Sequence, residues 1–180
     1  MVRSVLDHAV VGLLWPQLSS HGTVLIAAMM GQQTNVDGVL LGIRAVGPLM
    51  RRRGGSIVIV SSVAGLTSGP EYAAFVTSKA AVLGLVRPAA VDLGADQIRV
   101  NSVCPRWTRT GMSEREAELM AAEEGITAEQ LWSRLVEPLP LGRAADPDEI
   151  AACIEFLAGP GASFVTGAVL VAEGGSSAVE

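Results

Sequence analysis

The stretch Gly55-Ser56-Ile57-Val58-Ile59-Val60-Ser61-Ser62 decides the fold class of this chain. Its β-branched run begins after a glycine pair and ends in small polar residues, which predicts a short strand buried on both faces. Residues 71–93 follow it and carry alanine, valine and leucine on nearly every side, which predicts a buried helix ending at Gly94. We expect Pro88 to kink this helix or to restrict its last turns.

Strands and helices continue to alternate along the rest of the chain. Asp146 as N-cap and Pro147 at the first helical position predict a helix that runs to about Leu157. This order of elements predicts an α/β fold with a parallel sheet and helices on both faces. The other predicted elements are strands at 98–103 and 168–171, an apolar helix at 35–50, and one or two mobile helices over a cleft at 113–136.

Composition limits the classes of function. The 180 residues are 49% hydrophobic and 17% charged, which indicates one globular domain over residues 1–180. A net charge of −5 argues against a nucleic-acid surface, because little on the chain would neutralise phosphates. We expect no leader peptide and no membrane span. Cys104 and Cys153 lack metal-ligand spacing, so we expect two free thiols in a reducing cytoplasm and no metal site.

Eight motifs occur in an order that characterises one protein family. They are Asn35-Val36-x-Gly38, Gly55-Ser56-Ile57-Val58-x-x-Ser61-Ser62, Phe75-Val76-Thr77-Ser78-Lys79, Ile98-Arg99-Val100-Asn101-Ser102-Val103-x-Pro105, Pro140-Leu141-Gly142-Arg143, Asp148-Glu149-Ile150-Ala151, Thr166-Gly167-Ala168 and Gly174-Gly175. Together they span residues from about 35 to 176 and resemble the short-chain dehydrogenase/reductase family. The third motif, which follows Ser62 at the family's spacing, is similar to the family's Ser…Tyr-x-x-x-Lys active site.

The resemblance implies a Rossmann-like, doubly wound fold and an oxidoreductase that uses NAD or NADP, with a small apolar alcohol or ketone as ligand. In the family, the serine orients the substrate and the tyrosine passes a proton. The lysine lowers the tyrosine pKa and binds the nicotinamide ribose, and the asparagine holds a water. Carried over by position, the catalytic residues are Asn35, Ser62, Phe75 and Lys79. The cofactor-binding residues are Lys79, Pro105, Arg106, Thr108 and Thr110.

Phe75 departs from the family pattern where the chemistry needs a hydroxyl. Positions 75 and 79 lie on one helix face, so the lysine would stabilise a phenolate at position 75, but phenylalanine offers none. A positioned acid or base contributes about 10²–10⁴ in rate. Tyr72 lies seven residues from Lys79, about 10 Å along a helix, which is too far to substitute. We therefore predict impaired or absent hydride transfer.

Two further departures concern the cofactor. Arg106 replaces a family glycine, where a side chain would crowd the nicotinamide. We expect it to point to solvent, with a phosphate or carboxylate contact as the alternative. The sequence contains no glycine-rich phosphate loop of the kind that cradles a pyrophosphate. Val5–Val10 resembles the family's fourth strand, so we expect a truncated domain that lacks the first strands.

Some residues keep two interpretations. Asn35 is either a helix N-cap or the family's water-holding asparagine. Trp107 and Trp132 either line an apolar pocket or, as we favour, pack in the ordinary way.

Three functions remain open. The first is an oxidoreductase. The second is a non-catalytic partner that uses helices 35–50 and 71–93 to form a homo-oligomer, or a hetero-oligomer with a complete family member. The third is a non-redox lyase, isomerase or cyclase that reuses Ser62 and Lys79.

Overall fold

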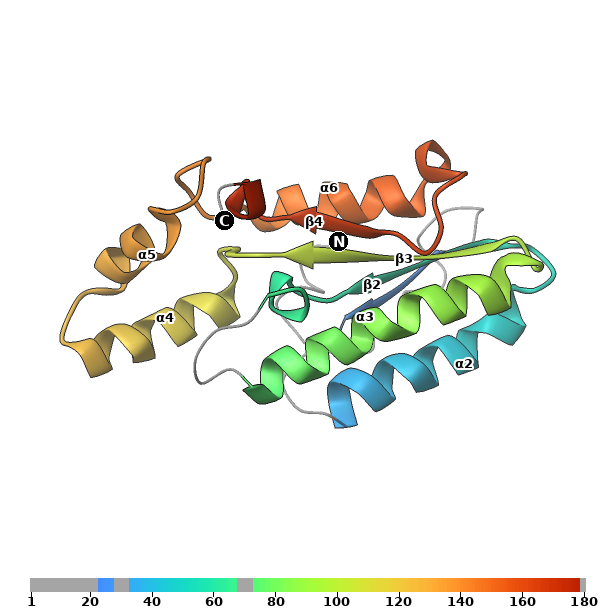
Figure 1. Ribbon diagram of the computed structural model, residues 1–180, viewed down its shortest axis with the longest axis horizontal. Helices are drawn as coiled ribbons and strands as arrows, with labels where there is room; N and C mark the ends of the chain where they lie inside the picture. The colour runs from blue at the N-terminus through green and yellow to red at the C-terminus, as the bar shows by residue number, and fades with distance from the viewer. Residues whose placement is uncertain (1–22, 28–32, 68–72, 179–180) are drawn as a thin grey trace.

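The computed structural model describes residues 23–27, 33–67 and 73–178 and shows an α/β fold. Within these residues, one sheet of four parallel strands has the spatial order β1-β2-β3-β4. Helices cover both of its faces, with α2 and α3 on one and α6 on the other (Figure 1). The predicted fold class is confirmed. The elements are β1 Thr23–Ala27, α2 Gly38–Met50, β2 Gly55–Val60, α3 Ala73–Gly94, β3 Ile98–Pro105, α4 Gly111–Glu124, α5 Ala128–Val136, α6 Pro147–Ala158 and β4 Val169–Ala172.

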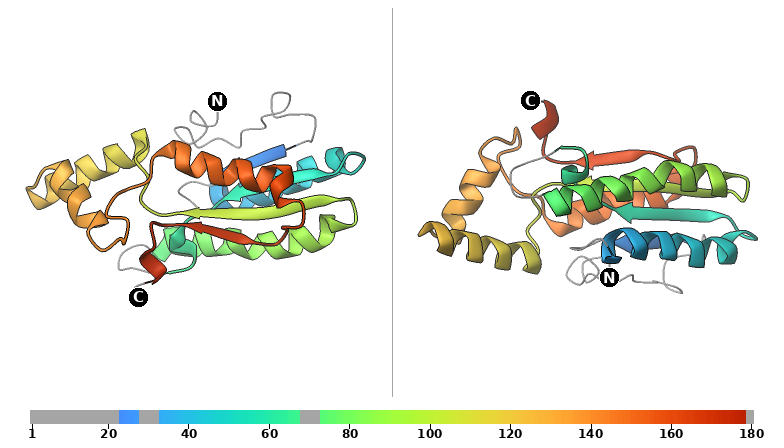
Figure 2. Two further views of the ribbon diagram at one scale, coloured as in Figure 1. Left: turned by 90° about the horizontal axis from the view of Figure 1, so that it is seen from above. Right: turned by 60° about the horizontal axis from the view of Figure 1, so that its bottom comes forward.

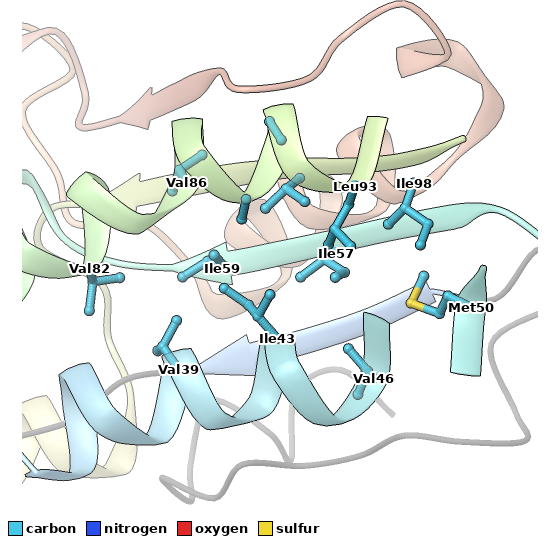
Figure 3. Packing of buried hydrophobic residues seen from close by; sticks show 13 residues of the cluster. Val39, Ile43, Val46, Met50, Ile57, Ile59, Val82, Val86, Leu93 and Ile98 are labelled. Atoms are coloured by element: carbon cyan, nitrogen blue, oxygen red, sulfur yellow. The ribbon is translucent and has the colours of Figure 1, made fainter. Parts of the chain in front are cut away.

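Strand β2 is buried on both faces, as predicted. Ile57 and Ile59, both 0% exposed, point to the side of α2 and α3, and Figure 3 shows them between the two helices. Val58 and Val60 point to the opposite side and pack under α6. Successive side chains of a strand face opposite ways, so an unbroken apolar run requires a cover on both sides.

The connection from β3 to β4 passes over one face of the sheet, whereas the two earlier connections pass over the other face. The strand order advances in one direction, yet α6 lies on the other side of the sheet from α2 and α3. This connection therefore has the opposite hand to the first two, although parallel strands are nearly always joined with one hand. It first passes through α4 and α5, which lie beyond the carboxyl ends of the strands (Figures 1 and 2).

The two long apolar helices differ from the prediction at particular points. The helix predicted at 35–50 begins at Gly38, after a π-helical turn at Gln33–Asp37. Helix α3 ends at Gly94 as predicted, but Pro88 does not shorten it. Pro88 and the residue four positions earlier, Gly84, both lie on the exposed side, so water can satisfy the carbonyl that loses its partner.

Helix α3 is also the one helix among the described residues that has the length and composition to cross a membrane. Its inward positions pack against the sheet, as those of a globular core helix do. They are Ser78, Lys79, Val82, Val86, Ala89, Ala90 and Leu93.

The C-terminal elements follow the predicted signals closely. The Asp146 side chain accepts the N–H of Asp148, and the Glu149 side chain accepts the N–H of Asp146, which makes a complete capping box for α6. The predicted stretch 113–136 forms the two helices α4 and α5, each with its own capping box. The strand predicted at 168–171 lies at Val169–Ala172. For α6, the predicted capping residues therefore place the start of the helix.

Arg99 on β3 joins the end of α6 to the sheet. Its guanidinium donates to the carbonyl oxygens of Leu157 at 2.8 Å and of Ala158 and Gly159 at 3.2 Å. It also donates to the Val165 oxygen at 3.3 Å, just before β4. The carbonyls of Leu157, Ala158 and Gly159 lie at the end of α6, where a helix leaves them without an intrahelical partner.

Asn101 fixes the start of β4 in the same way, from the same strand. Its Nδ2 donates to Val165 O at 2.8 Å, and its Oδ1 accepts the N–H of Ala168 at 3.0 Å. Arg99 and Asn101 of the fourth motif thus hold the end of α6 and the start of β4 against β3.

We expect Arg99→Met to lower the free energy of unfolding by about 2 kcal/mol, because several helix-end carbonyls lose a charged donor. Arg99→Lys should recover part of this loss, since an ammonium reaches fewer of the four oxygens. Arg87→Met, which alters an exposed arginine on α3, is the matched control. Urea unfolding measures all three variants, and an equal effect of Arg87→Met would contradict the assignment.

Candidate active site

The turn that follows β2 lies directly against the backbone of α3. A 3-10 turn at Val63–Gly65 begins after Ser62, whose hydroxyl accepts the N–H of Ala64 at 3.2 Å. The hydroxyl of Ser61 donates to the carbonyl oxygen of Lys79 at 3.0 Å. A Cβ added at Gly65 would lie 2.8 Å from both the carbonyl carbon and oxygen of Lys79. Only glycine allows this approach, so the serine turn and the lysine turn are held together.

Lys79 is buried and lies beside an aromatic ring. Its side chain is 4% exposed, and Nζ lies 5.5 Å from the centroid of the Phe75 ring. The predicted i, i+4 placement is therefore confirmed. Burial lowers the pKa of Lys79 to about 8, while a Cys104 thiolate would act in the opposite direction. Desolvation dominates because a charged amine loses its hydration in this environment.

Cys104, on β3, connects Ser62 with Lys79. The cysteine is 0% exposed, and burial raises its pKa to about 11, although hydrogen bonds with Ser102 and with the Ser62 backbone lower it. The thiol is therefore protonated at neutral pH. Cys104 lies at the carboxyl end of β3, its hydrogen bond to the Ser62 backbone reaches the carboxyl end of β2, and its interaction with Lys79 reaches α3. These three elements therefore meet at Cys104.

Asn35 lies in the π-helical turn rather than at a helix start. It is 0% exposed, and its Nδ2 donates to the hydroxyl of Ser78 at 2.8 Å. That hydroxyl in turn donates to the carbonyl oxygen of Phe75 at 2.8 Å. The N-cap alternative for Asn35 is wrong, because the residue before α2 is Asp37. Among the described residues, the Oδ1 of Asn35 is buried without a hydrogen-bond partner.

Arg106 does not point to solvent, which corrects the prediction. The backbone N–H of Arg106 donates to Ala172 O, so the backbone at Arg106 still lies beside β4. The guanidinium therefore turns toward the C-terminal turn and donates from Nη1 to the hydroxyl of Ser176 at 2.8 Å. Burial would raise the pKa of Glu173, but hydrogen bonds from Ser177 and Ser176 and then the charge of Arg106 lower it. Nε is buried without a partner among the described residues.

The two threonines of the same loop serve local structure. The Thr108 hydroxyl donates to Arg106 O at 3.3 Å. Thr110 is the N-cap of α4, where its hydroxyl accepts the N–H of Ser113. Both hydroxyls are thus engaged within the loop between Pro105 and α4.

Trp107 and Trp132 form an edge-to-face pair with centroids 6.2 Å apart. Trp132 is 2% exposed in the small core between α4 and α5, which confirms packing as its role. Trp107 also lines a pocket of about 170 Å³, as the alternative interpretation of this residue predicted, together with Leu139, Glu149, Cys153 and Glu173. The sequence did not reveal these other residues, because the lining comes from four separate segments and no local pattern marks it.

Two predicted features lie outside the described residues. They are Tyr72, the tyrosine that we considered as a substitute, and the strand expected at Val5–Val10. The first described strand is instead Thr23–Ala27, which pairs with β2.

Comparison with known proteins agrees with this architecture. A family model described as enoyl-(acyl carrier protein) reductase matches residues 27–177. The short-chain dehydrogenase RED2 of Pyricularia oryzae is 37% identical over 160 residues, which cover 81% of this chain and 55% of RED2. The chain spans 55–57% of the length of the first curated relatives it matches.

Solved structures show the same fold. A short-chain dehydrogenase family protein from Francisella tularensis superposes with a TM-score of 0.81 at 26% identity, covering 87% of this chain and 71% of that one. An NAD⁺-bound xylitol dehydrogenase superposes with a TM-score of 0.71 at 30% identity, covering 82% and 66% respectively. Nicotinamide cofactors therefore belong to this group of proteins.

The described residues fit such a cofactor only in part. Lys79 and the Pro105–Thr110 loop gather at the carboxyl edge of the sheet, where ligands of open α/β sheets bind. However, Arg106 and both threonines are engaged with the protein itself. Within 23–27, 33–67 and 73–178, no strand leads through a glycine-rich turn into a helix that would hold a pyrophosphate.

The buried amine makes stability depend on pH. Between pH 8 and 10.5 the unfolded chain holds a proton at Lys79 that the folded chain has released, so stability rises with pH. From about pH 7.5 to about pH 9 we expect the free energy of unfolding to rise by about 1 kcal/mol. Cys104 acts in the opposite sense, mainly above pH 9, because its pKa is raised from 9.0.

Urea unfolding at the two pH values, with Lys79→Met as the comparison, measures this rise. It should disappear in the variant. The same rise in both proteins would contradict a lowered pKa for Lys79.

Proposed function

The chain belongs to the short-chain dehydrogenase/reductase family, and we propose that it is an oxidoreductase of this family whose hydride transfer is impaired. One observation carries the proposal: the ring of Phe75 occupies the place beside Lys79 where the family's mechanism needs a phenol. Reduction of a ketone requires a proton at the oxygen as the hydride reaches the carbon. A positioned acid supplies that proton in the transition state, and phenylalanine has none.

The neighbouring groups do not replace the phenol. Cys104 has a pKa of about 11 and is fully buried, and Ser62 is an alcohol with a far weaker acidity than a phenol. In the family, the lysine lowers the pKa of the tyrosine, which is missing here, and binds the nicotinamide ribose. The partial fit of the cofactor loop adds a second cause of low activity. If a ligand binds at this edge, we infer a small apolar alcohol or ketone, consistent with the ring of Phe75.

We expect the purified chain to oxidise NADH or NADPH no faster than a protein-free control when it is given small ketones. Phe75→Tyr should raise the rate by about 10²-fold or more, because the new phenol would lie beside Lys79. Phe156→Tyr, which changes a half-exposed ring on α6, is the control and should change nothing. Absorbance at the NADH band measures all three. Clear ketone turnover by the unsubstituted chain would overturn the proposal.

A second candidate, a non-catalytic subunit, is favoured by the outer face of α2 and α3. Leu41 and Leu49 on α2 are 59% and 63% exposed, and Val91 on α3 is 80% exposed. The exposed positions of α3 include four alanines and Gly84, beside the polar residues Thr77, Arg87 and Asp92. In the part of the chain that the structure describes, nothing covers this face, and such apolar patches mark interaction surfaces. The partner would be a second copy or another family member.

Light scattering coupled to size-exclusion chromatography should show a dimer or a larger oligomer. Leu41→Glu combined with Leu49→Glu should shift it toward the monomer, because two charges would have to be buried. Leu119→Glu on α4, where the leucine is 69% exposed, is the matched control and should leave the mass unchanged. A monomer at all concentrations would rule this candidate out.

A further inference from the structure

We propose that the pocket between α6, the end of β4 and Trp107 binds a small uncharged molecule built around one aromatic ring. This pocket lies on the α6 side of the sheet, whereas Lys79 belongs to α3, which packs on the other side. Binding there uses no nicotinamide and does not depend on whether the chain transfers hydride. The position, the size, the walls and the paired charges of the pocket support this assignment.

The pocket lies just beyond the carboxyl ends of β3 and β4. Trp107 follows β3, and residues 172–174 form the end of β4 and the turn after it. Ile150 and Cys153 of α6 line the pocket from the helix. In open α/β sheets, ligands bind outside the carboxyl ends of the strands. The pocket is therefore in a region where this architecture places ligand sites.

The volume of the pocket, about 170 Å³, suits a single ring. In another protein, an apolar cavity of about 150 Å³ holds benzene, whereas pockets for drug-sized ligands measure about 300–1,000 Å³. A benzene ring with one or two small substituents matches the first case. A nucleotide or a fused polycyclic molecule is too large.

Apolar side chains form most of the wall. Leu139 and Ile150 are buried, and the ring of Trp107 is held by its edge-to-face contact with Trp132. An aromatic ligand gains from contact with such a ring beyond the area that it buries. The other apolar residues of the lining are Leu141, Ala145 and Ala172.

The thiol of Cys153 adds a neutral wall on the side of α6. Burial raises the pKa of this thiol, and the negative charge of Glu149 acts in the same direction. The thiol is therefore protonated at neutral pH, and a protonated cysteine behaves as a small apolar side chain.

The charged residues of the lining already have partners in the chain. Arg143 donates to both carboxylate oxygens of Glu149, at 2.7 and 2.8 Å, and both side chains are about half exposed, at the open side of the pocket. The carboxylate of Glu173 accepts hydrogen bonds from two serines and interacts with the charge of Arg106. Among the described residues, a charged ligand would therefore find no lining charge that lacks a counter-charge. Burying an unpaired charge is costly, so an uncharged ligand is favoured.

Cys153 is a natural reporter of occupancy. The chain has two cysteines, and Cys104 is 0% exposed, so alkylation of the folded chain by N-ethylmaleimide reports on Cys153. With 4-fluorophenol as the probe, we expect a dissociation constant of about 1 mM, which a ligand of this size can reach. At about 10 mM the probe should therefore slow alkylation of Cys153 near neutral pH about 10-fold. Peptide mass mapping measures the rate, and an unchanged rate would overturn the proposal.

Two charged analogues test the class of ligand. Near neutral pH, 4-fluorobenzoate is negative and 4-fluorobenzylamine is positive, and both carry the same ring as the probe. We expect each to protect Cys153 at least about fivefold less than 4-fluorophenol does, because neither finds a free counter-charge. Equal protection by either analogue would contradict an uncharged ligand. The alkylation rate of N-acetylcysteine with each compound corrects for any reaction with the reagent itself.

Substitutions that fill the pocket locate the binding. Fluorine NMR of 4-fluorophenol should show line broadening with the unsubstituted chain and no broadening with Ala145→Leu, because the larger side chain occupies the space of the ring. Ala152→Leu makes the same change at an exposed position of α6 outside the lining and should keep the broadening. Cys153→Leu is a second filled variant, and circular dichroism checks that each variant is folded. Broadening that persists in a folded, filled variant would overturn the proposal.

Discussion

The burial of β2 on both faces is the constraint on which the rest of the structure depends. A strand with four consecutive apolar residues, at positions 57–60, cannot lie at a surface, so it requires α2 and α3 on one side and α6 on the other. The strand ends where the polar residues begin, at Ser61 and Ser62. Its burial therefore fixes the depth and direction of the turn that carries the serine. The sheet also sets the position of β3, whose end supplies Cys104.

The candidate site is a product of backbone contact as much as of side-chain chemistry. Gly65 permits the serine turn to touch α3 at Lys79, and the π-helical turn turns Asn35 inward to the same helix. These contacts bring the serine turn, Asn35 and Lys79 to one helix. An aromatic ring without a hydroxyl, that of Phe75, lies beside the amine of Lys79.

Much of the fold was predictable because its signals are local. The β-branched run of β2 and the Asp146-Pro147 start of α6 depend on residues within one turn of the chain, and both were placed correctly. The relation between positions 75 and 79 follows from helix geometry alone. Strand β1 and the direction of Arg106 were missed, because they depend on partners distant in sequence, β2 for the strand and Ser176 for the arginine. The other residues that line the pocket beside Trp107 were missed for the same reason.

Strand β4 joins the sheet across residues 106–168, whereas residues 61–97 separate β2 from β3. The entropy lost in closing a loop grows with its length, and non-local pairing slows folding. The sequence separation between paired strands is therefore larger for β3 and β4 than for β2 and β3. The α2–β2–α3–β3 portion can assemble from near neighbours, so we expect β4, with its opposite-handed connection, to join the sheet after this portion has formed.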